Sequence, residues 1–107
     1  MNTIHPTVTV SPRLGTLLTQ LADTPDLETA LQKVLSEYMN LKIAFLRQRV
    51  EMFESRWNMK FEMFAAHCES GTLNQDAYSY QVEDDFWAWE EAETLLQHYE
   101  SLQARWM

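Results

Sequence analysis

The chain has 107 residues, with 16 Asp or Glu, 8 Lys or Arg and a formal net charge of −8. This length predicts one domain by default. A domain of this size buries only about two-thirds of its unfolded surface, so part of its apolar surface is expected to need a partner. The single cysteine, Cys68, excludes an internal disulfide and is typical of a reducing compartment. The N-terminus lacks the basic and apolar regions of a signal peptide, and no apolar run approaches the roughly 18 residues of a membrane span. We therefore expect a cytoplasmic protein without membrane contact.

The charge is distributed unevenly along the chain. Residues 1–60 hold seven Lys or Arg and six Asp or Glu, a net of +1, whereas residues 61–107 hold ten acids and only Arg105, a net of −9. The acids either keep a small protein soluble or form a surface that attracts a basic partner, and the sequence leaves both interpretations open. Either way, contact between the second half and nucleic acid is disfavoured.

The N-terminal third predicts a strand followed by a helix. Residues 7–10 alternate Thr and Val, which is the pattern of a short strand. Ser11 and Pro12 then supply an N-cap and a first-turn proline. The helix that they begin is expected to end near Asp23.

The longest predicted helix begins at a second cap-and-proline pair, Thr24-Pro25, and runs to about Trp57. It has two apolar stripes about 110° apart, so it needs two surfaces to pack against. We expect one of them to come from a second copy of the chain. The first stripe consists of Leu27, Leu31, Val34, Tyr38, Leu41, Phe45 and Met52, and the second of Leu35, Met39, Ile43, Leu46, Val50, Phe53 and Trp57.

Two shorter elements are predicted after this helix. Asn58 occupies the position of a left-handed helix end, and a short helix follows that Gly71 closes. The alternating stretch from Tyr78 through Tyr80 to Val82 is predicted to be extended and able to add as a strand to a partner.

A last helix is predicted to be capped by Asp84 or Asp85 and to reach about Arg105. Phe86 and Trp87 are expected to lie off its inner face. That inner face comprises Ala88, Trp89, Ala92, Leu95, Leu96, Tyr99, Leu102 and Trp106.

No constellation of residues predicts catalysis. Phe64 and Leu95 stand three residues before His67 and His98, where a helical di-metal motif would have Glu. Cys68 lies beside His67, but adjacent helical residues point about 100° apart, so a buried structural cysteine is favoured. No glycine-rich phosphate loop is present. We expect no enzyme, no metal and no cofactor.

Two features favour recognition of a protein. Lys42, Arg49 and Arg56 recur every seven residues between the two stripes, where they either extend over the core edge or pair with acids in a dimer or on the last helix. Trp87 should be exposed among acids, either as an interface anchor or as an ordinary surface aromatic. The candidate partner-binding residues are Lys42, Arg49, Arg56, Trp57, Tyr78, Tyr80, Phe86, Trp87, Glu90 and Glu91.

The order strand, helix, turn, helix over residues 7–40 resembles the ribbon-helix-helix fold of small bacterial repressors and antitoxins. The resemblance rests on residues 7–10, on Pro12 with Leu14, Leu18 and Leu21, on the turn Asp23-Thr24-Pro25, and on Leu27, Ala30, Leu31, Val34, Leu35 and Tyr38. The later stretches 51–54, 57–59 and 61–64 look like the helical toxin-binding tails of small antitoxins.

This resemblance implies an intertwined homodimer through residues 7–57 whose paired strands present Thr7 and Thr9 to operator DNA. Asp23 and Asp26 depart from the family pattern, because they would repel a phosphate at the start of the second helix. The resemblance also implies that the acidic tail binds a basic, ribonuclease-type toxin.

The expected fold is mainly α, with a short N-terminal β-strand, a long central helix, a short helix and a C-terminal helix. Residues 1–58 would form the dimerisation region and residues 59–107 the partner-binding region. The expected function is that of an antitoxin with weak autoregulatory DNA binding. Two alternatives stay open, a helical dimeric adaptor or subunit of a larger complex and a DNA-binding repressor without a toxin.

Overall fold

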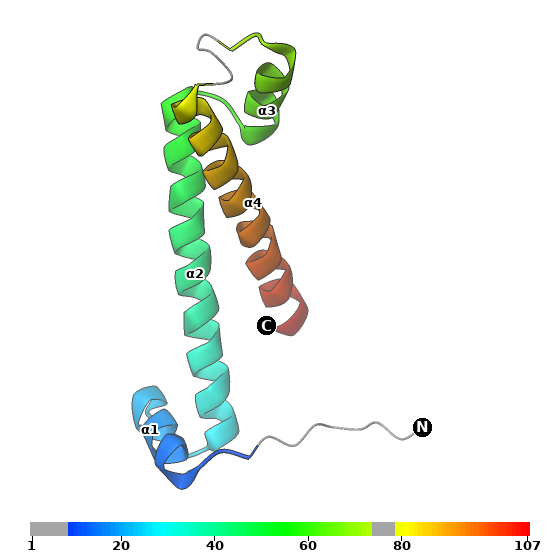
Figure 1. The fold of residues 1–107 in the computed structure, drawn as a ribbon. Helices are drawn as coiled ribbons and strands as arrows, with labels where there is room; N and C mark the ends of the chain where they lie inside the picture. Colours follow the sequence, from blue (N-terminus) through cyan, green and yellow to red (C-terminus); the bar gives the residue numbers. More distant parts are fainter. Residues whose placement is uncertain (1–8, 74–78) are drawn as a thin grey trace. The chain divides into compact units, whose positions relative to one another are not determined.

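The computed structural model describes residues 9–73 and 79–107, which form four helices and, within these ranges, no strand (Figure 1). The prediction of a mainly α protein is confirmed. Thr9 and Val10 are not in a strand, while Thr7 and Val8 lie outside the described residues. The helices are α1 (Pro12–Ala22), α2 (Leu27–Trp57), α3 (Phe61–Ser70) and α4 (Tyr80–Trp106).

The chain divides within α2 into two compact units, of which the first ends at Tyr38 and the second comprises Met39–Met107. The boundary predicted at residue 58 lies inside the second unit. Residues from both sides of that position share one core there, as Phe53 and Trp89 do.

The ends of α1 agree with the prediction. The Ser11 hydroxyl accepts a hydrogen bond from the Leu14 amide at 3.2 Å, and Pro12 occupies the first turn. Asp23 ends the helix in the left-handed conformation, with φ of 52°. The capping and proline preferences of these positions therefore fix both ends.

The predicted start of α2 was wrong by two residues. The helix begins at Leu27, and Asp26 rather than Thr24 caps it: the Asp26 carboxylate accepts hydrogen bonds from the Thr29 amide, at 3.1 Å, and from the Thr29 hydroxyl. These bonds stabilise the charged form and lower the pKa of Asp26. Asp26 caps the helix in place of Thr24, because its carboxylate reaches two donors in the first turn and Thr24 lies two residues farther from the helix.

The turns on both sides of α3 also agree with the prediction. Asn58 has a φ of 54° immediately after α2, and Gly71 has a φ of 71° immediately after α3. The left-handed region favours Gly and tolerates Asn, so these two residues end their helices where a bulkier residue would be strained.

The predicted start of α4 was wrong. The Ser79 hydroxyl accepts a hydrogen bond from the Val82 amide at 3.3 Å, so Tyr80 and Val82 belong to the first turn of α4 and are not extended. Asp84 and Asp85 lie within the helix. Val82 is almost fully buried in the helical arrangement, and three alternating residues are too few to distinguish a strand from a capped helix start. Tyr78 lies outside the described residues.

The second unit is built on the second stripe of α2. Figure 1 shows α4 running back along α2, with α3 at the end where the two helices meet. One cluster joins Ile43, Leu46 and Val50 of α2 to Ala92 and Leu96 of α4. The other gathers side chains of all three helices, namely Phe53, Phe64, Val82 and Trp89.

Candidate protein-binding surface

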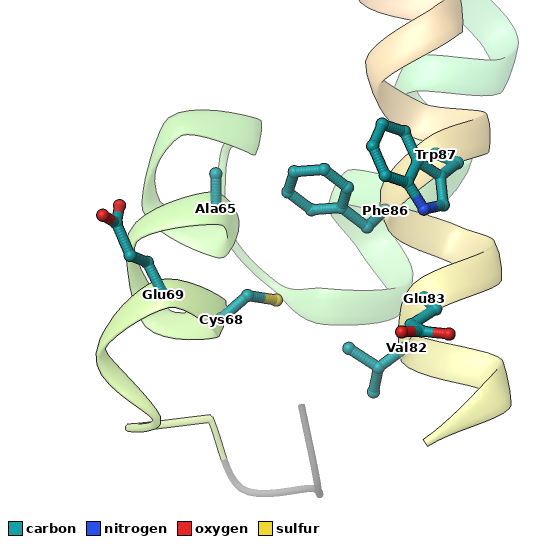
Figure 2. Close-up of a pocket in the computed structure, with 7 residues that line it drawn as sticks. All are labelled: Ala65, Cys68, Glu69, Val82, Glu83, Phe86 and Trp87. Carbon is teal, nitrogen blue, oxygen red and sulfur yellow. The ribbon is translucent and has the colours of Figure 1, made fainter. Parts of the chain in front are cut away.

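A groove of about 400 Å³ separates α3 from α4 at the surface of the second unit (Figure 2). Figure 2 shows the Phe86 ring and the Cys68 sulfur between the two helices, with the Glu69 carboxylate farther out on α3. The walls are therefore mostly apolar, and each helix also contributes one acidic residue to the lining. The lining residues are Ala65, Cys68 and Glu69 of α3 and Val82, Glu83, Phe86 and Trp87 of α4.

A cluster of aromatic rings forms the floor of this groove; its members are Phe61, Phe64, Phe86 and Trp89. The Phe86 ring lies 5.5 Å from the Phe61 ring and 6.4 Å from the Phe64 ring, measured between centroids. Phe64 in turn lies 5.1 Å from the buried Trp89 ring. Rings at these separations pack favourably and fix one another's orientation.

Phe86 was predicted to lie off the inner face of the last helix. It is half-buried because α3 covers a side of α4 that does not face α2. Trp87 is 66% exposed, as predicted, and its ring stands nearly perpendicular to that of Phe86, at 88° and 5.3 Å. The groove thus has a packed floor and one exposed tryptophan at its edge.

Asp85 fixes the first turns of α4 against the end of α2. Its carboxylate is held by Arg56 Nη1, 2.8 Å from each oxygen, and by Trp57 Nε1, 2.9 Å from Oδ2. The Asp85 residue is only 5% exposed. Buried charge is stable only with such partners. Of the two interpretations of the basic residues Lys42, Arg49 and Arg56, Arg56 agrees with the one in which they pair with an acid of the last helix. Both Arg56 and Trp57 therefore make contacts within the chain.

The other two cations of the row lie farther along α2. Arg49 is half-buried, with its guanidinium 5.9 Å from the centroid of the Phe53 ring, and Lys42 is exposed. A further cation that the spacing did not single out, Arg47, pairs with Glu100 at 3.1 Å. Because both members of that pair are largely exposed, it adds little stability.

The remaining candidate residues lie mostly on α4. Glu90 and Glu91 share a shallow groove of about 410 Å³ with Trp87, Thr94 and Leu95. Tyr80 is exposed in the first turn of α4. Thr7 and Tyr78 lie outside the described residues, and Thr9 is exposed before α1. The predicted contact of Thr7 and Thr9 with DNA stays a prediction.

The α3 side of the groove was not predicted from the sequence. Ala65 and Glu69 became lining residues only through the angle at which α3 meets α4. Cys68 was expected to be buried and is half-buried; burial raises the pKa of its thiol, so the sulfur is a neutral apolar part of the lining.

Neither a metal cluster nor a membrane span is found in the part of the chain that the structure describes. No three His, Cys, Asp or Glu side chains of residues 9–73 and 79–107 gather as metal ligands would. None of the helices there combines the length and the apolar character needed to cross a membrane.

Comparison of the chain with protein-family models, curated proteins and solved structures finds no match.

Proposed function

We propose that the groove between α3 and α4 binds a basic protein, and that the chain acts as an antitoxin that neutralises a ribonuclease-type toxin. The observation that carries this proposal is the exposed Trp87 at the edge of an apolar groove whose lining residues include the acids Glu69 and Glu83. Exposed tryptophans over packed apolar surfaces are typical anchors of protein interfaces.

The groove fits a specific kind of occupant. Its apolar walls would receive an aliphatic or aromatic side chain, while Glu69 and Glu83 would pair with neighbouring Lys or Arg of the partner. The Arg56–Asp85 contact and the aromatic floor hold this surface in one arrangement, so little ordering is needed on binding.

The charge of α4 suits a partner that otherwise binds RNA. Residues 80–107 carry seven Asp or Glu and one Arg, a net of −6. A cationic cleft that binds the RNA backbone would attract this helix, which would then compete with the phosphates for the same Lys and Arg side chains. Inhibition by occupying the cleft would need no catalytic group in this chain.

The proposal is tested by mild purification of the tagged chain from its native host, followed by mass spectrometry. A small basic protein should co-purify in stoichiometric amount with the unchanged chain. It should be lost with Trp87→Ala and retained with Trp106→Ala, a matched control because the two tryptophans are 66% and 72% exposed on the same helix. Anchor truncation typically costs at least about 2 kcal/mol of binding, or roughly thirtyfold in Kd.

Two results would contradict this function. The first is a chain that purifies without a basic companion. The second is a companion whose retention does not depend on Trp87. If a companion is found, its expression alone should arrest growth and degrade RNA, and co-expression of the unchanged chain should restore growth.

A helical adaptor of a larger complex is the second candidate, and one observation favours it. The first stripe of α2 is exposed in the second unit, with Leu41 72% and Phe45 57% exposed. Exposed apolar side chains in a row along one helix mark an interaction surface. The two candidates are separated by the companion: an adaptor would co-purify with subunits that are neither basic nor toxic.

A further inference from the structure

Trp87 lies between two grooves that both open along α4. It lines the groove between α3 and α4, and it also lines the shallow groove of about 410 Å³ farther along α4. Glu83 belongs to the first groove and Thr94 to the second. The two grooves therefore meet at the Trp87 side chain, and together they are called the Trp87 surface below.

The Trp87 surface follows one side of α4. Glu83, Trp87, Glu90 and Thr94 succeed one another at intervals of four, three and four residues, which is the spacing of one side of a helix. Trp87 is 66% exposed, whereas Leu96, which packs against α2, is buried. From Glu83 to Thr94 this side of the helix is about 16 Å long, or three turns. The surface is thus long enough to contact three turns of another helix.

The charged residues that line the Trp87 surface are all acids. They are Glu69 of α3 and Glu83, Glu90 and Glu91 of α4, and none of the lining residues that the structure describes is Lys, Arg or His. Glu91 also lines a groove with Arg49, so the charge that a partner would meet is counted from the other three acids alone. The ion pairs in the described part of the chain do not involve these acids: they join Arg47 to Glu100, Arg56 to Asp85 and Lys60 to Glu54. The surface is therefore complementary to Lys and Arg of another molecule.

Along most of the Trp87 surface the backbone of α4 is bonded within the helix. Residues 86–95 lie inside α4, where amides and carbonyls bond to each other at i to i+4. An extended segment bound here would bury its own amides and carbonyls without partners. Residues 9–73 and 79–107 contain no strand whose edge it could join. A helix bonds its own backbone and presents only side chains, so it is the element that fits this surface.

We propose that the Trp87 surface binds one amphipathic basic helix of a partner protein. The apolar side chains of that helix would enter the α3–α4 groove beside Phe86, and Lys or Arg at its borders would pair with Glu83 and Glu90. An Arg side chain would also gain energy by stacking on the exposed Trp87 ring. This proposal rests on the proposed function, because both require that Trp87 contacts a basic protein, but it does not require that this protein is a toxin.

The test measures binding of synthetic peptides to the purified full chain by calorimetry. Isolated helices shorter than about 15 residues are marginal in water, so the probe has roughly 18 residues. It consists of Leu, Lys and Arg, with all Leu side chains on one side of the helix. One control peptide has the same composition with Leu distributed around the helix, and another has Pro at a central polar position of the probe. The probe should bind, and each control should bind roughly tenfold or more weakly, because it loses either the burial of a Leu or the helix itself.

Tryptophan variants of the chain locate the peptide. Trp87→Ala should weaken binding of the probe by roughly thirtyfold, the effect of truncating an interface anchor. Trp106→Ala is the matched control, since Trp106 is 72% exposed on the same helix but outside both grooves. It should bind the probe like the unchanged chain.

Charge variants test the pairing with the acids. Glu83→Gln combined with Glu90→Gln should weaken binding of the probe by roughly three- to tenfold, because two partly exposed ion pairs are lost. Glu28→Gln combined with Glu37→Gln is the matched control, because it removes the same charge at two exposed acids near the start of α2. It should bind the probe like the unchanged chain. Thermal unfolding of every variant shows that the chain stays folded.

Three results would overturn the proposal: a probe that does not bind, control peptides that bind as tightly as the probe, or equal effects of the two double charge variants. These results leave the proposed function to be decided by its own test, because a basic toxin can contact Trp87 without using a helix. Conversely, a chain that purifies without a basic companion contradicts the antitoxin function and leaves the result with the peptides unchanged.

Discussion

At the scale of single residues, Asp85 holds α4 to the end of α2. Its carboxylate accepts two hydrogen bonds from Arg56 and one from Trp57, while the residue is almost fully buried. Asp85→Asn should lower the free energy of unfolding by about 1–3 kcal/mol, because the amide has one acceptor oxygen where the carboxylate has two and loses the charge. The partly exposed Arg56 keeps the loss below that of a fully buried pair.

The matched control for Asp85→Asn is Asp84→Asn, which makes the same change at an exposed neighbour in the same turn. It should change the unfolding free energy by less than about 0.5 kcal/mol. Urea unfolding followed by tryptophan fluorescence measures both variants. Equal effects at the two positions would show that the Asp85 contacts do not stabilise the fold.

Glu93 is a half-buried carboxylate whose charge opposes folding. Burial is the main cause that raises its pKa above the ordinary value of 4.5, and the charges of Glu54 and Glu62 add to it, although a hydrogen bond from Trp89 and the charge of Lys60 act in the opposite direction. The unfolded chain keeps the ordinary pKa, so the ionised group destabilises the fold above the folded pKa. As the pH falls through the folded pKa towards 4.5, the folded protein takes up the proton first and gains stability.

Glu93→Gln should therefore be more stable than the unchanged chain at neutral pH, and this advantage should shrink as the pH falls to about 4.5. Thermal unfolding at a series of pH values measures the difference. Thr94→Ser, at the next residue, leaves the carboxylate in place and should keep the original pH dependence. An advantage of Glu93→Gln that grows towards acid pH would refute the raised pKa.

At the scale of elements, the ends of a helix could be predicted where a single residue has the conformational preference or the side-chain hydrogen-bond acceptor that a helix end needs. Asn58 and Gly71 have positive φ, and Ser11 offers the side-chain oxygen that an N-terminus needs. The start of α4 could not be found in this way, because Ser79 is one of several polar residues and Tyr80 to Val82 also fits a strand. Burial of Val82 against Phe64 decided in favour of the helix, and that contact depends on the tertiary fold.

The same distinction applies to the candidate surface. The exposure of Trp87 follows from its place on the helix, because it lies away from Trp89. The burial of Phe86 does not follow from its place on the helix, because it depends on contacts with α3. The position of α3 relative to α4 cannot be predicted from the sequence of either helix alone. Likewise, the spacing of the basic residues identified Arg56 as a pairing candidate, but the choice of Asp85 as its partner depends on how α2 and α4 are aligned.

Capping of α4 by Ser79 yields a direct prediction for that element. Ser79→Ala should lower the unfolding free energy by about 0.5–2 kcal/mol, because the Val82 amide loses its acceptor. Ser101→Ala makes the same change at an exposed position inside α4 and should be neutral or slightly stabilising, since alanine favours helix interiors. Chemical unfolding followed by circular dichroism compares them; a larger loss for Ser101→Ala would exclude the capping role.

At the scale of the whole molecule, the two units differ in how much apolar surface they bury. The two buried apolar clusters described above both lie in the second unit, Met39–Met107. The first unit has Leu18 and Ala30 as its buried apolar residues within the described range 9–38, and α1 leaves Leu14, Leu17 and Leu21 exposed. Stability therefore concentrates in the second unit, since apolar burial is the main favourable term in folding. The position at which the chain can be cut follows from this distribution.

Residues 39–107 expressed alone should unfold cooperatively, with a midpoint close to that of the main transition of the full chain. This fragment keeps Phe53, Phe64 and Trp89 together. Cutting instead at the boundary that the sequence suggests separates Phe53 from Phe64 and Trp89, so residues 1–58 and 59–107 should each show a shallow transition without a defined midpoint. Thermal unfolding of the three fragments, followed by circular dichroism, distinguishes the two boundaries. A cooperative transition in residues 59–107 alone would mean that α3 and α4 fold without α2, and the boundary at residue 58 would then be the correct one.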